Sequence, residues 1–288
     1  MALSLVLSIP GLAYAEFNFT TIDVPGSTST AANGNSTKQI VGGYDDAGGN
    51  THGFILDKQG TFRKVDVPNV LSTQLNGVNE EGQIVGTYVD STRLHGFFLN
   101  KGKITTLDPP NSIRSQGGFI NAKGQIVGAY RTSDQKRHGY IWRNGVFTSF
   151  NVPNDHPVLG TVPLGINDRG QVVGNYVDGN GGLLGPNDGR HGFLLNKGIY
   201  TQLDVPGAAF TVAQGINNEG QIVGLYLNDD DSEHGFIWNK EGGYTTIDVP
   251  DGAWTDVYSI NAEGKIVGAY GDVDGVTHGY VGRPTRQE

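Results

Sequence analysis

The chain has 288 residues, a net charge of −9, 45 glycines, 17% charged residues and no cysteine. The lack of cysteine excludes a disulfide framework and thiol chemistry, and the negative charge argues against a nucleic-acid partner. Regular apolar runs from end to end exclude a low-complexity, disordered chain.

The chain begins with an apolar run that ends in the small-x-small sequence Ala13-Tyr14-Ala15. This resembles the end of a secretory signal peptide cleaved before Glu16, although no Lys or Arg precedes the run, so a hydrophobic N-terminal arm is the alternative. A membrane span is disfavoured, because it needs about 20 apolar residues and Pro10-Gly11 interrupts this shorter run. We expect a secreted or periplasmic protein with residues 1–15 as a signal segment and 16–288 as one domain.

One pattern then recurs six times. Each copy contains Asn-x-x-Gly-Gln-Ile-Val-Gly-x-Tyr or a close variant, then His-Gly-Phe or His-Gly-Tyr, and most continue to an Asp-Val-Pro sequence. The repeated asparagines lie 42 to 50 residues apart, at Asn35, Asn79, Asn121, Asn167, Asn217 and Asn261. The His-Gly pairs begin at His52, His95, His138, His191, His234 and His278. A period of this length is typical of a four-stranded propeller blade.

The second copy predicts four strands, over 72–79, 83–89, 95–100 and 103–108, because alternating β-branched and aromatic residues are separated by turn residues. The prolines that follow the fourth strand stand where the chain crosses to the next copy, where a missing N–H costs no ladder bond. No segment shows sustained 3.6-residue periodicity, so the chain is predicted to be all-β, with almost no helix.

The two ends of the chain complement each other. The last copy supplies three strands and ends near Val281, whereas Phe17–Pro25 reads as a fourth strand with no first three before it. If this segment completes the last copy, the array closes into a ring without exposed ends. We therefore predict a six-bladed β-propeller; an open β-solenoid is the alternative, and it leaves the mismatch unexplained.

The Gly-Gln-Ile-Val-Gly-x-Tyr and His-Gly-Phe sequences resemble the extracellular HAF-type repeats of bacteria. The resemblance covers residues 17–281. It implies export and a propeller-like array, and it brings no established activity and no catalytic residues.

Six equally spaced histidines suggest a metal site, but a ligand set must converge on one point and these residues lie around a ring. Each histidine begins a third strand, between an acid after the second strand and the Asp that ends the fourth. For His95 the expected partners are Asp90 and Asp108. We predict that these histidines lock strand pairing, and that His138, which has Thr132 and Asn151 at the acid positions, lacks both partners.

Function is better sought where the copies differ. On one face of the ring, here called the top face, the second strand leads into the third and the fourth crosses to the next blade. Copies three and four depart most on that face, through basic residues, a lengthened crossing at 154–162 and a long link at 177–190. Insertions confined to one face often mark the binding face.

Within that region we expect Arg114, Arg137 and Arg190, with Asp155 and His156, to receive an anionic group such as a uronate, sulfate or phosphate ester. A solvated loop carrying ordinary surface charge is the alternative.

Two further features on the top face suggest ligands. Asp178 with Asn180, and Asp272 with Asp274, resemble the start of a calcium loop but lack its later glutamate, so calcium is the one cofactor that the sequence suggests. Trp254 is placed to stack on a sugar ring, or else to cover the core.

Two classes of function remain. The first is a secreted propeller that binds a glycan or another anionic extracellular ligand. The second is a polysaccharide hydrolase or lyase with Asp155 and His156 as its catalytic residues. The fold does not choose between them.

Overall fold

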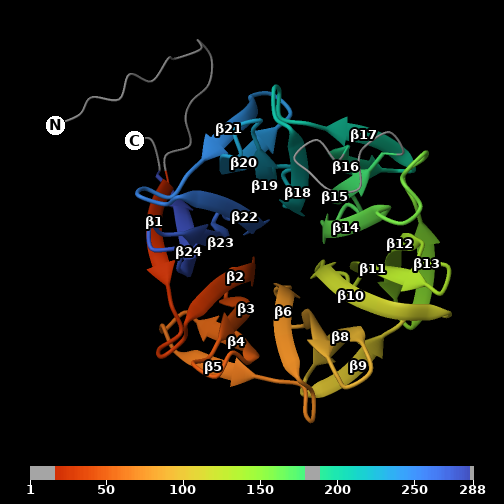
Figure 1. Cartoon of the computed structure of the whole chain (residues 1–288), viewed down its shortest axis with the longest axis horizontal. Helices are drawn as coiled ribbons and strands as arrows, with labels where there is room; N and C mark the ends of the chain where they lie inside the picture. Colours follow the sequence, from red (N-terminus) through yellow and green to blue (C-terminus); the bar gives the residue numbers. More distant parts are fainter. Residues whose placement is uncertain (1–16, 179–188, 286–288) are drawn as a thin grey trace.

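The structure is a computed structural model that describes residues 17–178 and 189–285. The predicted signal segment and the calcium candidate Asn180 lie outside the described residues. The described chain is all-β, and it forms six four-stranded antiparallel sheets arranged as the blades of a propeller (Figure 1). In each blade the first strand lies nearest the central axis and the fourth lies at the rim. None of the described residues form a helix long and apolar enough to cross a membrane.

The blades follow one another along the chain, each built from strands that are consecutive in sequence except at the closure. Blade 1 comprises β2 (Ser29–Asn35), β3 (Gln39–Asp45), β4 (Thr51–Asp57) and β5 (Phe62–Val65). Blade 2 comprises β6 (Ser72–Val78), β7 (Ile84–Val89), β8 (Leu94–Asn100) and β9 (Lys103–Leu107). Blade 3 comprises β10 (Ser112–Ile120), β11 (Ile126–Thr132), β12 (Arg137–Arg143) and β13 (Val146–Phe150). Blade 4 comprises β14 (Thr161–Ile166), β15 (Val172–Val177), β16 (Arg190–Asn196) and β17 (Ile199–Leu203). Blade 5 comprises β18 (Phe210–Ile216), β19 (Ile222–Leu227), β20 (Glu233–Asn239) and β21 (Gly243–Ile247). Blade 6 comprises β22 (Trp254–Ile260), β23 (Ile266–Gly271), β24 (Thr277–Pro284) and β1 (Phe17–Ile22).

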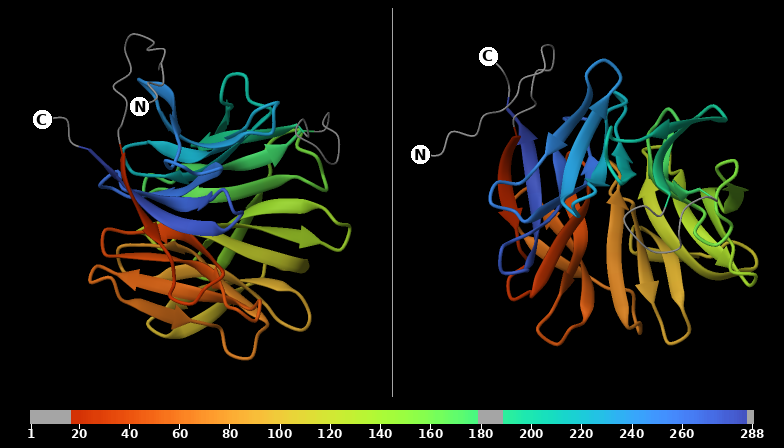
Figure 2. Two further views of the ribbon diagram at one scale, coloured as in Figure 1. Left: turned by 60° about the vertical axis from the view of Figure 1, so that its left-hand side comes forward. Right: turned by 45° about the horizontal axis from the view of Figure 1, so that its top comes forward.

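The predicted ring closure is confirmed. Strand β1 pairs with β24 from Phe17 opposite Pro284 to Ile22 opposite Gly279, and Figure 2 shows the two strands side by side where the first and last blades meet. The closure continues beyond the strand, since the Asp23 carboxylate lies 3.0 Å from Nδ1 of His278. The first and last segments of the chain are therefore held together by main-chain hydrogen bonds.

The repeated asparagines close the turn between the first and second strands and also join neighbouring blades. In blade 2, Asn79 Oδ1 accepts hydrogen bonds from the N–H groups of Glu81 and Gln83, while its Nδ2 donates to the carbonyl oxygen of Asn121, 3.0 Å away in the next blade. The same link runs from Asn121 through Asn167 and Asn217 to Asn261. In blade 1, Ser36 holds this position and Asn35 does not, because Ser36 Oγ accepts the equivalent turn bonds and its carbonyl accepts from Asn261.

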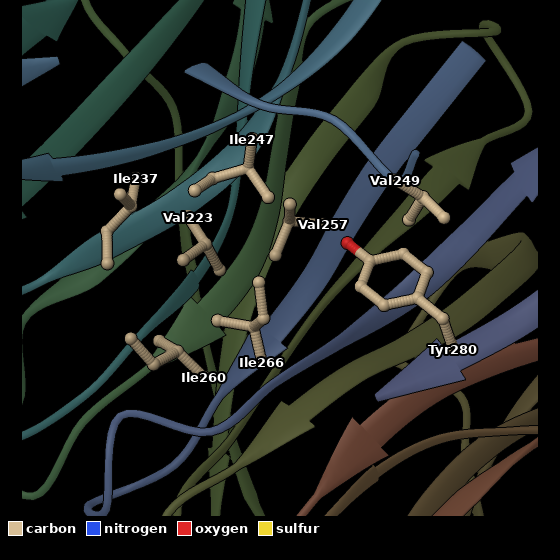
Figure 3. Packing of buried hydrophobic residues seen from close by; sticks show 8 residues of the cluster. All are labelled: Val223, Ile237, Ile247, Val249, Val257, Ile260, Ile266 and Tyr280. Atoms are coloured by element: carbon tan, nitrogen blue, oxygen red, sulfur yellow. The ribbon is translucent and has the colours of Figure 1, made fainter. Parts of the chain in front are cut away.

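The core lies between the blades. The aromatic residue after each His-Gly pair is almost completely buried: Phe54, Phe97, Tyr140, Phe193, Phe236 and Tyr280. The glycine in each Val-Gly-x-Tyr sequence makes room for this ring, since a Cβ on Gly86 would lie 2.7 Å from Phe97. Figure 3 shows one such cluster, in which side chains of blades 5 and 6 pack around Ile266 and Tyr280. Burial of this kind is the main favourable term in folding.

The histidines have the predicted structural partners. His95 is buried, with Nδ1 2.8 Å from Asp108 and Nε2 3.2 Å from Asp90, and its ring stacks on Tyr88. Equivalent contacts to the fourth-strand acid are made by His52, His191, His234 and His278. The prediction that His138 lacks both partners is wrong in one respect. The amide oxygen of Asn151 lies 2.8 Å from Nδ1 of His138 and takes the place of the aspartate carboxylate that the other blades have there.

Candidate functional site: an arginine row at the channel mouth

Three arginines stand opposite one another across the first three strands of blade 3. Arg114 of β10 pairs with Arg131 of β11, which pairs with Arg137 of β12. Like charges placed directly opposite one another on neighbouring strands are destabilising. The repeat does not require them, because blade 2 carries Ser72, Val89 and Leu94 at the paired positions. We call these three residues the arginine row.

The row is not neutralised within the described chain. Burial, together with repulsion from Arg131, Arg114 and Arg190, lowers the pKa of Arg137 to about 10. Burial and Arg114 also lower the pKa of Arg131, whose Nε is buried without a hydrogen-bond partner. No ion pair to any of the three is found over residues 17–178 and 189–285. Three neighbouring cations that repel one another, two of them partly buried, favour an added anion.

Arg190 extends the positive charge into blade 4. It opens β16 immediately before His191, the same repeat position that Arg137 occupies in blade 3. Its guanidinium carbon lies 4.8 Å from the centre of the Phe210 ring, a cation–π contact that holds the side chain over blade 5. The structure thus brings together the three arginines that the sequence predicted, and adds Arg131.

The row borders the top of the central channel. Arg114, Arg131 and Arg137 line a hollow of about 10 Å³ together with Gln116, and Gln116 also lines a larger cavity along the channel. A space of that size is at the lower limit for one water molecule. The hollow therefore has no room for an anion beneath the guanidinium groups.

The crossing at 154–162 is held against the row. The carbonyl oxygen of Pro157 accepts a hydrogen bond from the Arg137 N–H at 2.9 Å. The Asp155 carboxylate accepts from Asn151 Nδ2 at 2.7 Å and from the Thr161 hydroxyl at 2.6 Å. Asp155 thus supplies a carboxylate beside the position where the other blades have an acid and blade 3 has Asn151.

His156 shapes the same crossing. Its Nδ1 accepts hydrogen bonds from the N–H groups of Val158 and Leu159, each at 3.2 Å, so only Nε2 is left for a ligand. Catalysis by Asp155 and His156 stays a prediction, as does their contact with a ligand.

Of the other predicted ligand residues, Trp254 and Asp272 lie away from the row, whereas Asp178 lies beside the 154–162 crossing. Trp254 opens β22 in blade 6, across the ring from blade 3, and packs half-buried against Gly271. Asp272 Oδ1 accepts from the N–H groups of Asp274 and Val276, and its Oδ2 lies 3.2 Å from His278. Asp178 forms a bridge with Asp155. Among the described residues, no group of three or more His, Asp or Glu side chains is arranged to hold a metal ion.

A much larger hollow lies elsewhere, at the joint between blades 1 and 6. It measures about 970 Å³ and is lined by turn and outer-strand residues that include Lys58, Lys265 and Arg283. Acids share its lining, among them Asp57 and Glu263. Burial lowers the pKa of Lys265, and Glu263 partly opposes that effect. Because its charges are mixed and it is wide, we regard the arginine row as the stronger candidate despite its smaller hollow.

A buried carboxyl pair between blades 5 and 6 was not foreseen from the sequence. Asp256 of β22 is 8% exposed and accepts a hydrogen bond from the Tyr258 hydroxyl at 2.9 Å, while its Oδ1 has no resolved partner. Burial, and then the neighbouring carboxyl of Glu233, raise the pKa of Asp256 to about 9. At neutral pH this side chain is therefore protonated, although an unfolded chain would leave it ionised.

This pair predicts a pH-dependent stability. Between the unfolded pKa of 3.8 and about 9 the folded chain binds an extra proton at Asp256, so its contribution to stability falls as the pH rises through that range. The amide of the Asp256→Asn variant needs no proton. We therefore expect the variant to be as stable as the wild type near the bottom of this pH range, and more stable than the wild type near the top by at least about 1 kcal/mol. Thermal melts of both proteins across the range measure this, and a constant difference in melting temperature would contradict it.

Comparisons with known proteins show the fold and no family. No family model matches the sequence, and no curated protein matches it. Among solved structures, SapL1 lectin in complex with α-methyl fucoside matches with a TM-score of 0.59 and 11% identity, covering 88% of this chain and 93% of that one. A mutant of the Aleuria aurantia lectin, in complex with α-methyl-L-fucoside, matches with a TM-score of 0.52 and 13% identity, covering 91% of this chain and 93% of that one. A gluconolactonase from Xanthomonas campestris matches with a TM-score of 0.55 and 11% identity, covering 93% of this chain and 90% of that one.

Proposed function

We propose that this protein binds acidic carbohydrate, with a carboxylate or sulfate group seated on the arginine row of its top face. The observation that carries the proposal is the row itself: three paired arginines, of which Arg131 and Arg137 are partly buried, with no ion pair among the described residues. Guanidinium groups form paired hydrogen bonds with planar oxyanions. The bound acid would relieve the repulsion that the fold otherwise carries.

Carbohydrate is the favoured carrier of the acid for two reasons. The solved structures with a similar ring include lectins in complex with fucosides, so this fold accommodates sugars, although fold alone does not assign function. The net charge of −9 surrounds the row with a field that repels extended polyanions such as nucleic acids. Binding therefore depends on close contact at the row. We further propose, from the signal-like first residues, that this occurs outside the cytoplasm.

Calorimetric titration with an oligo-uronic acid, and with the same oligosaccharide as its methyl ester, tests the proposal. The ester keeps the sugar and removes the charge. We expect the acid to bind at least about tenfold more tightly than the ester, and its affinity to fall as salt rises from about 0.1 M to about 1 M, because exposed charge contacts are screened. Equal affinity for acid and ester would refute an anion-binding row.

A further inference from the structure

The channel beneath the row contains a cavity of about 240 Å³ whose lining includes five Asn and Gln side chains. Its wall includes Gln74 of blade 2, Gln116 of blade 3 and Gln214 of blade 5, with Tyr258 and Phe119 as aromatic neighbours. Gln116 also borders the hollow of the arginine row. Gln116 therefore lies between the cavity and the row and lines both.

The amides of this cavity divide into two groups. Asn33 Nδ2 donates to the carbonyl oxygen of Leu75 at 2.9 Å, and Asn76 Nδ2 donates to that of Gly117 at 2.6 Å, so both asparagines tie neighbouring blades together. The side chains of the three glutamines make no hydrogen bond within the described chain. Each glutamine amide offers two donor hydrogens and an acceptor oxygen, which suits the hydroxyl groups of a sugar.

We propose that the cavity receives the ring of a single acidic sugar, whose hydroxyl groups bond to Gln74 and Gln116 while its carboxylate reaches the arginine row. This rests on the proposed function and adds the ligand's size and orientation. Clefts for drug-sized ligands measure about 300–1,000 Å³, so a cavity of about 240 Å³ admits one ring and not an oligosaccharide. The protein thus recognises a free sugar acid or the end of an acidic chain.

Three probes separate the parts of the ligand: a free hexuronic acid, the parent hexose and acetate. The wild type is expected to bind the hexuronic acid more tightly than either fragment, with an affinity that does not increase for longer oligo-uronic acids. In the double variant Gln74→Ala/Gln116→Ala, affinity for the hexuronic acid should fall about tenfold, as expected for two lost hydrogen bonds. Acetate affinity should not change, because the arginines are intact. Gln59→Ala, at an exposed turn, is the matched control.

Failure of this inference differs from failure of the proposed function. If the double variant keeps the wild-type preference for hexuronic acid over acetate, or if affinity rises steadily with oligosaccharide length, the channel does not hold the sugar although the row binds the acid. If the wild type binds none of the acidic probes, the proposed function itself is wrong.

Discussion

Deletion of residues 16–25 is expected to lower the melting temperature by about 10 °C or more, or to cause aggregation. The deletion removes β1, which pairs with β24 over six positions, and the buried side chains of Ile22 and Val24. Burying two such side chains contributes roughly 3 kcal/mol or more, and each kcal/mol moves the melting temperature of a large domain by about 2–4 °C. The deletion also exposes β24 as an unpaired edge, which favours association. Thermal melts and size-exclusion chromatography measure both effects.

A milder substitution keeps this prediction testable if the deletion variant is insoluble. Ile22→Ala retains the strand and should cost about 2–5 kcal/mol, the usual range for truncating a buried isoleucine. Thr20→Ala, on the exposed side of the same strand, should change stability by no more than about 0.5 kcal/mol. A deletion variant that stays monomeric with the wild-type melting temperature would show that β1 does not close the ring.

Replacing the arginine row with the residues of blade 2 should abolish acid binding and raise stability. The triple variant Arg114→Ser/Arg131→Val/Arg137→Leu installs side chains that the same repeat already uses at the paired positions, so it is expected to fold. Removing two like-charged cross-strand pairs should stabilise by about 0.5–2 kcal/mol. Affinity for the oligo-uronic acid should fall at least about a hundredfold, since charge-assisted hydrogen bonds contribute about 1.5–3 kcal/mol each.

A matched variant distinguishes the effect of losing the arginine row from the effect of losing three positive charges anywhere on the protein. Arg63→Gln/Lys103→Gln/Arg143→Gln removes three exposed cations outside the row, from β5, β9 and the far end of β12, and it should bind the acid like the wild type. Both triple variants are titrated with the same oligo-uronic acid and then melted. Binding that survives in the row variant, or that falls equally in both variants, would contradict a role for the row. Lost binding together with lost stability would show that the arginines serve the fold.

The sequence predicted the architecture well because each repeated residue has a local role. Turn residues, alternating strands and the mismatch between Phe17–Pro25 and the incomplete last copy identified the closed ring, and the His–Asp contacts followed from strand order. The repeat spacing alone did not show that Ser36, and not the repeated Asn35, closes the turn in blade 1, because neighbouring residues fit the spacing nearly equally well. A sequence repeat therefore predicts those structural features that are the same in every copy.

The candidate site was predicted less completely, because it depends on register and burial. Arg131 was missed although a signal exists: the residue after each Val-Gly-x-Tyr tyrosine pairs with the residue before each histidine, as Arg131 does with Arg137. The Asp256–Glu233 pair had no such signal, because it forms between blades and its protonation follows from burial. Likewise, the sequence does not show that His156 Nδ1 is occupied by two backbone N–H groups.

A crystal structure of the protein soaked with a hexuronic acid tests the central claim most directly. The account predicts the carboxylate within hydrogen-bonding distance of the guanidinium groups of Arg131 and Arg137, with the sugar ring in the channel against Gln116. A hexuronic acid bound in the hollow between blades 1 and 6, or on the face opposite the row, with the row itself vacant, would contradict it.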